Sequence, residues 1–225
     1  MSERRSIPRR ILGNSILTIL WKDMLLETRT KDFFVSVLVF AIIVIVVFNF
    51  AVKPTPQTVG LVAPGILWIA MVFGGVLGLN RSFALEKEKG AVYGLLLAPV
   101  GRDSIYFGKV ATNFLFMFIV EAITFPLFAV IFNISLVAPG FLPIAVLATV
   151  GIAAVGTLFS AMTVNTRARD VMLPLLFLPV ALPVIVAAVE ATGLALDGAG
   201  WGSGARWLPF IGAFDAVFLV ACSIA

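Results

Sequence analysis

Histidine is absent from this sequence of 225 residues, and cysteine occurs once, as Cys222. Without histidine the chain lacks the commonest metal ligand, general base and proton relay of proteins. A single cysteine gives neither a disulfide framework nor a thiolate metal site, and we interpret Cys222 as a small buried hydrophobe. No Ser/His pair, HExxH motif or paired intramembrane Asp occurs, which speaks against an intramembrane protease or a metalloenzyme.

Charge is also scarce, and what replaces it defines the class of protein. Only 12% of the residues are charged, 61% are hydrophobic, and the mean hydropathy is +1.11. A soluble domain with a hydrated surface does not have this composition, so we expect a polytopic membrane protein. The phosphate-binding pattern G-x-x-x-x-G-K-[ST] is missing as well, so the chain by itself cannot bind and hydrolyse ATP through this motif. We expect a non-catalytic chain.

Six windows are apolar and about 20 residues long, which is the length that a helix needs to cross a hydrocarbon layer of about 30 Å. They predict an all-α membrane protein with six spans, the fifth of which contains Pro174, Pro179 and Pro183. Those prolines indicate either a kinked, moving span or a static kink. The windows are 33–52, 61–79, 107–132, 139–164, 171–189 and 208–225.

The basic residues lie mainly on one side of these predicted spans. Fourteen of the sixteen Lys and Arg residues fall in 1–32, 81–109 and 165–170, whereas only Lys53 and Arg206 fall on the other side. The positive-inside rule therefore predicts that both termini and the 81–109 segment are cytoplasmic. The net charge of +4 is explained by this topology and does not indicate a nucleic-acid partner.

The segment before the first span is expected to form an interfacial amphipathic helix rather than a cleavable signal peptide. Leu17, Leu20, Trp21 and Met24 recur at helical spacing, with polar residues on the opposite face. This pattern predicts a helix that lies flat in the cytoplasmic headgroup layer with Trp21 as its anchor. The helix would serve either as a topological anchor or in force transmission.

Residues 81–109 form a concentrated block of charge, RSFALEKEKGAVYGLLLAPVGRDSIYFGK, between the second and third spans. Gly90 can end a helix or admit another backbone, and Pro99 marks a turn before the chain re-enters the membrane. A simple connection needs only a few residues, so we expect one or two short helices that stand off the cytoplasmic surface. Such a segment either docks on a soluble partner or only satisfies topology.

Several motifs carry a resemblance to a known family. LEKEKG, LLLAPVGR and IYFGK resemble the loop between spans two and three of ABC-2-type transporter permeases. WKDMLLETRTKDFF, FNFAV, APGILWIAMVFGGVLGLNRSFALEKEKG and LLLAPVGRDSIYFGK are similar to the CcmB permease subunit of the haem exporter in system I cytochrome c maturation, over most of residues 20–135. Lys87 and Lys89 make the segment less acidic than this family pattern, and DGAGWGSGARW has no counterpart in it.

The resemblance implies a half-transporter in the bacterial inner membrane. Residues 1–32 would be the cytoplasmic N-terminus, 33–225 the permease domain, and 81–106 its coupling loop. The implied partners are a CcmA-like cytoplasmic ABC ATPase, a second copy of the chain, CcmC-like and CcmD-like membrane proteins and a CcmE-like periplasmic haem chaperone, besides the lipid bilayer. The residues implied to couple the chain to the ATPase are Glu86, Lys87, Glu88, Gly90, Leu95, Pro99 and Arg102.

The implied chemistry places ATP on the partner ATPase, haem as a candidate substrate, and no cofactor bound directly to this chain. Without histidine, axial ligation of haem would fall to Met, Tyr or Cys222, and no arrangement of these is persuasive. We therefore expect the chain to couple ATP hydrolysis to haem delivery or to release of the loaded chaperone. The alternatives are an ABC-2 permease for another lipophilic substrate and a non-transporting scaffold of the haem-handling complex.

Glu121 is an acidic residue inside the third predicted span, where an unpaired charge costs a few kcal/mol. We expect it to face the bundle interior and to form a structural hydrogen bond near Thr124 or Asn113, the alternative being a substrate-path or gating role. Asp215 in the sixth span is a similar case. The link NTRARD, residues 165–170, is interpreted as a positive anchor with Asp170 beginning the fifth helix; the alternative is a second ATPase contact.

Overall fold

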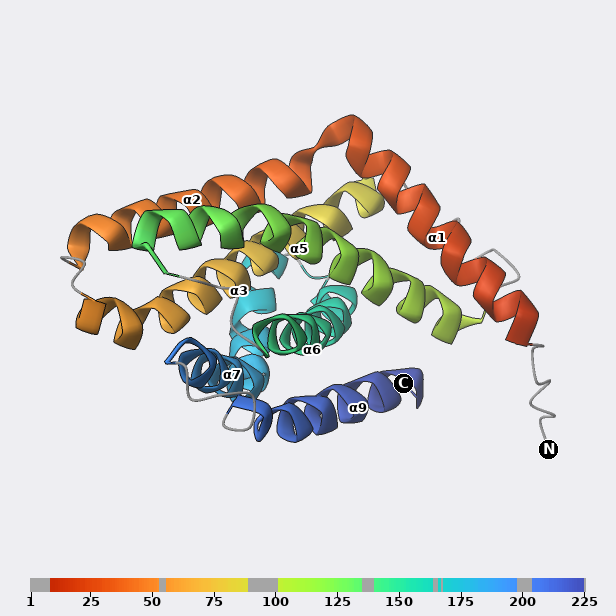
Figure 1. The fold of residues 1–225 in the computed structure, drawn as a ribbon. Coiled ribbons are helices and arrows are strands. Elements are labelled where there is room, and N and C mark those ends of the chain that lie inside the picture. The colour runs from red at the N-terminus through yellow and green to blue at the C-terminus, as the bar shows by residue number, and fades with distance from the viewer. Residues whose placement is uncertain are drawn as a thin grey trace.

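The computed structural model describes residues 9–52, 56–88, 101–134, 140–163, 166, 168–197 and 204–224. For residues 9–14, 32, 56–57, 81–88, 102, 169 and 222–224 it describes the backbone alone. The regular structure in these ranges is entirely helical, which confirms the expected fold class (Figure 1). The helices are α1 (Arg9–Thr30), α2 (Asp32–Ala51), α3 (Pro56–Glu88), α5 (Arg102–Phe132), α6 (Phe141–Thr163), α7 (Arg169–Leu196) and α9 (Leu208–Ile224).

Five of these helices are long and apolar enough to cross a membrane: α2, α3, α5, α6 and α7. Their apolar parts overlap the first five predicted windows, because sustained hydropathy over about 20 residues is the direct signature of a spanning helix. The sixth window corresponds to α9, whose apolar stretch, Leu208–Ala221, is shorter. All three prolines of the fifth window lie inside α7, which continues through them as one helix of 28 residues.

Helix α6 is the centre of the bundle. It packs against α3, α5, α7 and α9, and Figure 1 shows it between α5 above and α9 below. Residues 148–157, ATVGIAAVGT, are all buried except Val150, which is half-buried. Their small side chains let neighbouring helices approach closely, as is common in membrane interiors. A Cβ on Gly156 would collide with Leu79 of α3, so this contact depends on the missing side chain.

Helix α2 lies at the edge of the bundle, packed along α3. Glycines of α3 receive its side chains: a Cβ on Gly78 would lie 2.5 Å from the Phe33 ring, and one on Gly74 would lie 2.9 Å from Val37. Only 22% of the spanning window of α2 is buried, against 67% for α3 and for α6. The outer face of α2, which includes Val39 and Ile43, is exposed and is suited to contact with lipid.

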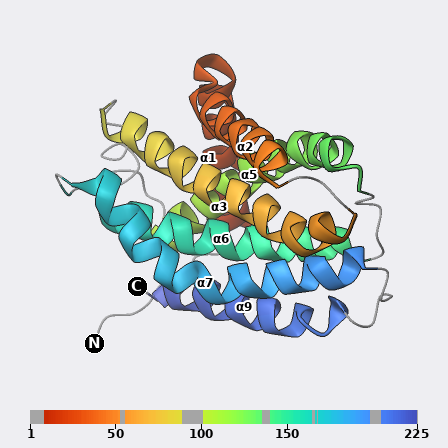
Figure 2. The same ribbon diagram turned by 90° about the vertical axis from the view of Figure 1, so that its left-hand side faces the viewer.

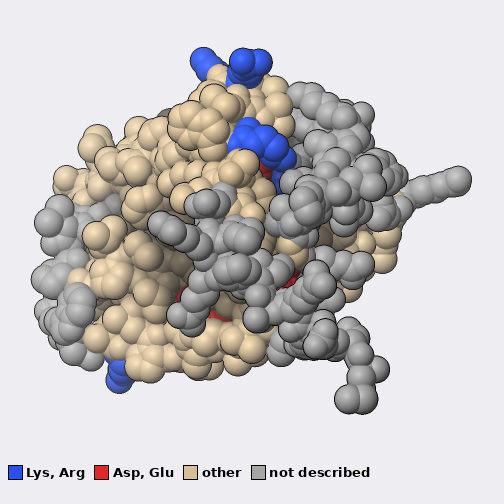
Figure 3. Space-filling view, turned by 90° about the vertical axis from the view of Figure 1, so that its right-hand side faces the viewer, with Lys and Arg blue, Asp and Glu red and all other residues tan. Residues whose placement is uncertain are grey.

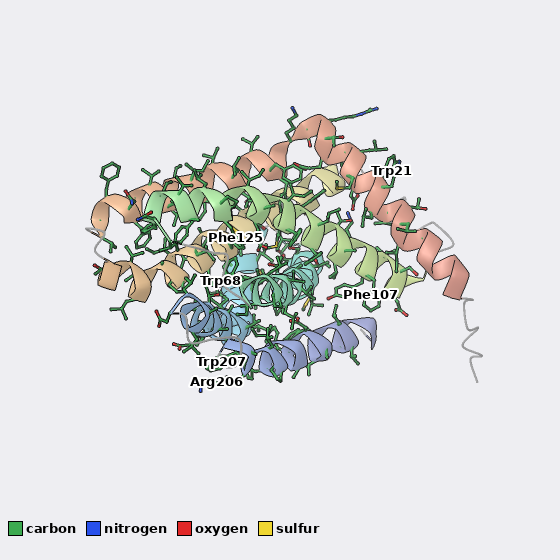
Figure 4. The ribbon with its side chains drawn as sticks, viewed as in Figure 1. Trp21, Trp68, Phe107, Phe125, Arg206 and Trp207 are labelled. Atoms are coloured by element: carbon green, nitrogen blue, oxygen red, sulfur yellow. The ribbon has the colours of Figure 1, made fainter. Side chains whose placement is uncertain are left out.

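Hydrogen bonds between side chains and neighbouring helices hold the interior together. The indole nitrogen of Trp68 on α3 donates to Thr192 Oγ1 on α7 at 3.0 Å, and Figure 4 places Trp68 inside the bundle. Asn113 Nδ2 on α5 donates to Thr157 Oγ1 on α6 at 2.8 Å. Such bonds contribute about 0.6–2 kcal/mol each inside a membrane protein.

The end of α3 and the beginning of α7 lie at the same end of the molecule, the left-hand edge of Figure 2. These are the places where the sequence concentrates Lys and Arg beside the predicted spans. Shared location at one end is what an alternating up-and-down arrangement of the helices requires.

Helix α3 departs from expectation, because residues 81–88 do not form a separate short helix. They continue α3, which runs unbroken for 33 residues from Pro56 to Glu88. At 1.5 Å per residue the helix is about 50 Å long, well over the roughly 30 Å of a hydrocarbon layer. Its apolar part ends at Asn80, so the charged last turns extend the same rigid rod by about 12 Å.

Candidate coupling site

The N-terminal helix α1 is packed against α5, a contact that the sequence analysis does not predict. Its expected place in the headgroup layer stays a prediction. On the inner face of α1, Ile19 packs against Gly108 of α5. The contact is close: a Cβ atom added to Gly108 would lie 3.0 Å from Ile19 Cγ2. Leu17 and Trp21 are 64% and 66% exposed, and Figure 4 shows Trp21 on the outer side of α1. The exposed residues of α1 thus include apolar side chains suited to a lipid-facing surface, beside the polar Thr18, Thr28 and Arg29.

A buried ion pair fastens the two helices. Lys109 Nζ on α5 lies 2.8 Å from Asp23 Oδ2 on α1, and the two side chains are 7% and 6% exposed. The second carboxylate oxygen of Asp23 lies 2.9 Å from Lys22 Nζ, which is half-exposed. Burial of this kind is tolerated only when each charge is compensated, so the pair fixes the position of α1 on α5.

The carboxylate of Glu27, one turn further along α1, caps the next helix. Its Oε1 accepts hydrogen bonds from the backbone N–H groups of Phe33 (2.8 Å) and Phe34 (3.2 Å) at the beginning of α2. Those N–H groups have no partner within the helix, and a negative charge there also complements the helix dipole. Between the helices Lys31 adopts a left-handed conformation with φ of 56°. The turn between α1 and α2 is thus stabilised by hydrogen bonds within the chain.

The described residues that the family resemblance implies for ATPase coupling lie at the end of α3 and at the beginning of α5. Glu86, Lys87 and Glu88 form the end of α3, and Arg102 is the first residue of α5. Gly90, Leu95 and Pro99 lie outside the described residues. Arg102 precedes the ion-paired Lys109 by seven residues, or about two helical turns. The end of the segment is therefore connected through α5 directly to α1.

Glu121 on α5 is buried and hydrogen-bonded to a different helix, as the structural interpretation predicted. The partner differs from both suggested ones. Thr149 Oγ1 on α6 donates to Glu121 Oε1 at 2.6 Å, whereas Thr124 donates to the backbone of its own helix. Glu121 Oε2 is buried with no hydrogen-bond partner among the described residues.

The remaining polar candidates do not gather into a site. Asp215 of α9 is buried beside Gly151 of α6. Asp170 lies in the first turn of α7, as predicted. In the part of the chain that the structure describes, no three His, Cys, Asp or Glu residues are placed to hold a metal ion. Cys222 lies in the last turn of α9.

The surface agrees with insertion into a membrane. Figure 3 shows a face whose described part is mostly uncharged, with Lys and Arg at the upper edge and again at the lower left, and a little Asp or Glu surface near the centre. Together with five long apolar helices, this defines a multi-pass α-helical membrane protein with a polar junction at one end, formed by α1, α2 and α5.

Comparison with known proteins gives the family. The family model described as "CcmB protein" matches residues 14–225, so the chain belongs to the CcmB family. It is 31% identical over 187 residues to "Heme exporter protein B" of Rhodobacter capsulatus, covering 80% of this chain and 85% of that one. It is 32% identical over 186 residues to the protein of the same name from Paracoccus denitrificans, covering 80% and 84%. The Pseudomonas aeruginosa protein of this name is 28% identical over 188 residues, covering 83% and 84%.

Proposed function

We propose that this chain is the permease subunit of an ABC transporter complex in cytochrome c biogenesis. It would couple ATP hydrolysis by a separate CcmA-like ATPase to haem export or delivery, or to release of the haem-loaded chaperone. The observation that carries the proposal is the similarity, over most of both chains, to proteins named heme exporter protein B. The chain itself is proposed to be non-catalytic.

The proposed coupling element consists of the end of α3, residues 89–100 and the beginning of α5. An ATPase that docks on Glu86, Glu88 and Gly90 would push on the end of a helix that is continuous to Pro56. A continuous helix is stiff along its axis, so displacement at Glu88 reaches the contact of Trp68 with α7. A displacement of α5 would move α1 with it through Lys109 and Asp23. Both routes support transmission by shifts of packed helices.

Haem is proposed as the substrate, and the side chains of this family member suggest that it is handled without a strong axial ligand. The sequence has no histidine, which is the commonest axial ligand in haem proteins. Haem would then pass along an apolar surface or be held by the partner proteins. In this proposal the contribution of the chain is a conformational change driven by the ATPase.

The proposed location is the bacterial inner membrane, with six spans and both termini in the cytoplasm. Helix α9 would be the sixth span: its 17 residues measure about 25 Å, slightly less than a hydrocarbon layer. The asymmetry of Lys and Arg supports the orientation. The proposed membrane partners are a second copy of the chain and CcmC-like and CcmD-like proteins, with a CcmE-like chaperone in the periplasm.

The test is haem staining of membrane c-type cytochromes in a strain that lacks its own permease. The strain is complemented with the wild-type chain, with a variant carrying Glu88→Arg and Gly90→Trp, or with Arg206→Glu. Arg206 is exposed and lies near the beginning of α9 (Figure 4). The positive-inside rule predicts that it is on the side of the membrane opposite the coupling element, so its reversal is a control for a charge change outside that element.

Rescue by the wild type and by Arg206→Glu, together with failure of the coupling variant at equal expression, supports haem export with ATPase coupling. Rescue by all three chains contradicts coupling and favours a scaffold of the haem-handling complex. If no chain rescues although each is inserted and co-purifies with the ATPase of the host, haem is the wrong substrate. An ABC-2 permease for another lipophilic substrate is then the better description.

A further inference from the structure

The turn between α1 and α2 carries two exposed basic side chains, which we name the turn cations. They are Arg29, in the last turn of α1, and Lys31, immediately before α2. No described residue forms an ion pair with either of them. Figure 3 shows Lys and Arg along the upper edge of the molecule, and Figure 1 places the turn at the same height. Both positive charges are therefore available to a group from outside the chain.

Lys31 has an unusual backbone conformation. Its φ of 56° and ψ of 14° are left-handed, and its N–H donates to the carbonyl of Glu27 at 2.7 Å. Glycine usually occupies this position just beyond a helix end, since it adopts the left-handed conformation without steric cost. A lysine there costs stability, and backbone strain of this kind is concentrated at functional positions. The positive-inside rule does not explain it, because a lysine elsewhere near the span would satisfy that rule equally well.

The position of the turn along the predicted span matches the level of lipid headgroups. The apolar part of α2 begins at Phe33, two residues after Lys31, which corresponds to about 3 Å along the helix axis. The headgroup layer extends about 5–8 Å beyond the hydrocarbon on each side of a bilayer. With α2 inserted from Phe33 onward, the turn cations therefore lie where the phosphate groups of the lipids are.

Each turn cation has an exposed apolar side chain one helical turn away. Leu25 precedes Arg29 by four residues and is 46% exposed, and Val35 follows Lys31 by four residues and is 56% exposed. Residues four apart lie on the same face of a helix. A ligand that matches all four side chains therefore combines a negative group with an apolar chain. A phospholipid has both, whereas a free phosphate ion or an acidic protein surface offers only the charge.

From this we propose that the turn between α1 and α2 binds an anionic phospholipid. Its phosphate lies between Arg29 and Lys31, and its acyl chains lie beside the exposed apolar side chains. Arginine binds phosphate through paired N–H groups, and lysine binds it as a point charge. Glu27 does not oppose the anion, because it is buried and its Oε1 accepts two backbone N–H groups of α2. The site goes beyond the proposed function and does not depend on it.

The first measurement is thermal unfolding of the purified chain in a neutral detergent, titrated with phosphatidylglycerol, phosphatidylcholine or inorganic phosphate. A ligand that binds only the folded chain raises the midpoint temperature. At a hundred times its dissociation constant, phosphatidylglycerol should raise the midpoint by about 5–10 °C for a chain of this size. Phosphatidylcholine, which has no net charge, should raise it by much less, and inorganic phosphate should leave it unchanged.

The second measurement repeats the titration with variants that separate the lipid site from the fold. Lys31→Gly relieves the left-handed backbone, so without lipid it should unfold at the wild-type temperature or above. It should nevertheless bind phosphatidylglycerol about fivefold more weakly, as should Arg29→Gln, and the double variant about 25-fold more weakly. Lys31→Arg keeps the charge and should bind like the wild type. Arg206→Gln, which removes an exposed cation outside the turn, is the matched control and should not alter the titration.

A response that is selective for phosphatidylglycerol and is lost with the two turn cations supports the inference. Equal responses to phosphatidylglycerol and phosphatidylcholine, or an unchanged titration of the double variant, would overturn it. An equal rise with inorganic phosphate would indicate a site for free anions, and the lipid would be rejected. If the double variant binds phosphatidylglycerol like the wild type but no longer co-purifies with an ATPase, the turn cations contact an acidic protein surface, and the inference is wrong.

Discussion

Replacing Lys109 by Met should destabilise the protein, because it leaves the buried carboxylate of Asp23 with only half of its compensation. Removing one partner of a buried pair typically costs about 3–5 kcal/mol. Asp23 keeps its contact with Lys22, so we expect the lower end, about 3 kcal/mol, or roughly a 150-fold change in the folding equilibrium. For a chain of this size that corresponds to a fall in midpoint temperature of about 6–12 °C.

The assay is thermal unfolding of the purified protein in detergent, followed by the loss of a monodisperse peak in size-exclusion chromatography. Lys22→Met is the matched control, since Lys22 contacts the same carboxylate but its side chain is 39% exposed. An exposed pair contributes little, at most about 1 kcal/mol. The control should therefore lower the midpoint temperature by no more than about 2–4 °C.

A double variant separates the ion pair from other consequences of losing Lys109. Asp23→Leu combined with Lys109→Met removes both charges, and replacement of a buried pair by apolar side chains is often neutral or stabilising. The double variant should therefore recover most of the lost midpoint temperature. If Lys109→Met unfolds with the wild type, or if the double variant is as unstable as the two single variants added together, the pair does not fasten α1 to α5.

Three further predictions concern other contacts and use the same unfolding assay. Glu121→Gln should keep the hydrogen bond from Thr149 and the stability of the wild type, whereas Glu121→Leu should cost about 1–3 kcal/mol by leaving the hydroxyl without its acceptor; equal stability of the two variants would exclude a structural bond. Glu27→Leu should cost about 1 kcal/mol by uncapping α2, and Glu27→Gln, which keeps an acceptor, should not; the reverse order would contradict the cap. Gly78→Leu should displace Phe33 and separate α2 from α3, which should lower the stability of the fold by about 1–3 kcal/mol. Leu77→Ala, on the exposed face of α3, is the neutral control. A Gly78→Leu chain as stable as the wild type would show that α2 can move away from α3 without cost.

The spans could be predicted from the sequence because hydropathy reports directly on the solvent that surrounds a helix. The first five windows correspond to α2, α3, α5, α6 and α7. Asp170 was also correctly placed in a first helical turn, since a carboxylate there complements the helix dipole. The residues attributed to ATPase coupling stay a prediction, because they follow from family resemblance and three of the seven lie outside the described residues.

The junction of α1 with α5 could not be predicted, because its two halves are far apart in the sequence. Asp23 and Lys109 are separated by 86 residues, and periodicity along α1 assigns Asp23 to water by default. The partner of Glu121 was missed for a related reason. Donors on the same helix, such as Thr124, are visible from spacing, but Thr149 is reached only when α6 packs beside α5. The local sequence pattern predicts the helices, whereas contacts between side chains of different helices depend on how those helices pack.

The ion pair between α1 and α5 has a consequence for how the chain is made. Asp23 leaves the ribosome 86 residues before Lys109, and at roughly 5–20 residues per second this takes about 4–17 s. During that interval α2 and α3 can already be inserted, while the carboxylate of Asp23 must stay in contact with water. The N-terminal helix therefore reaches its final position only after the third spanning helix arrives. Its attachment is a late event of biosynthesis.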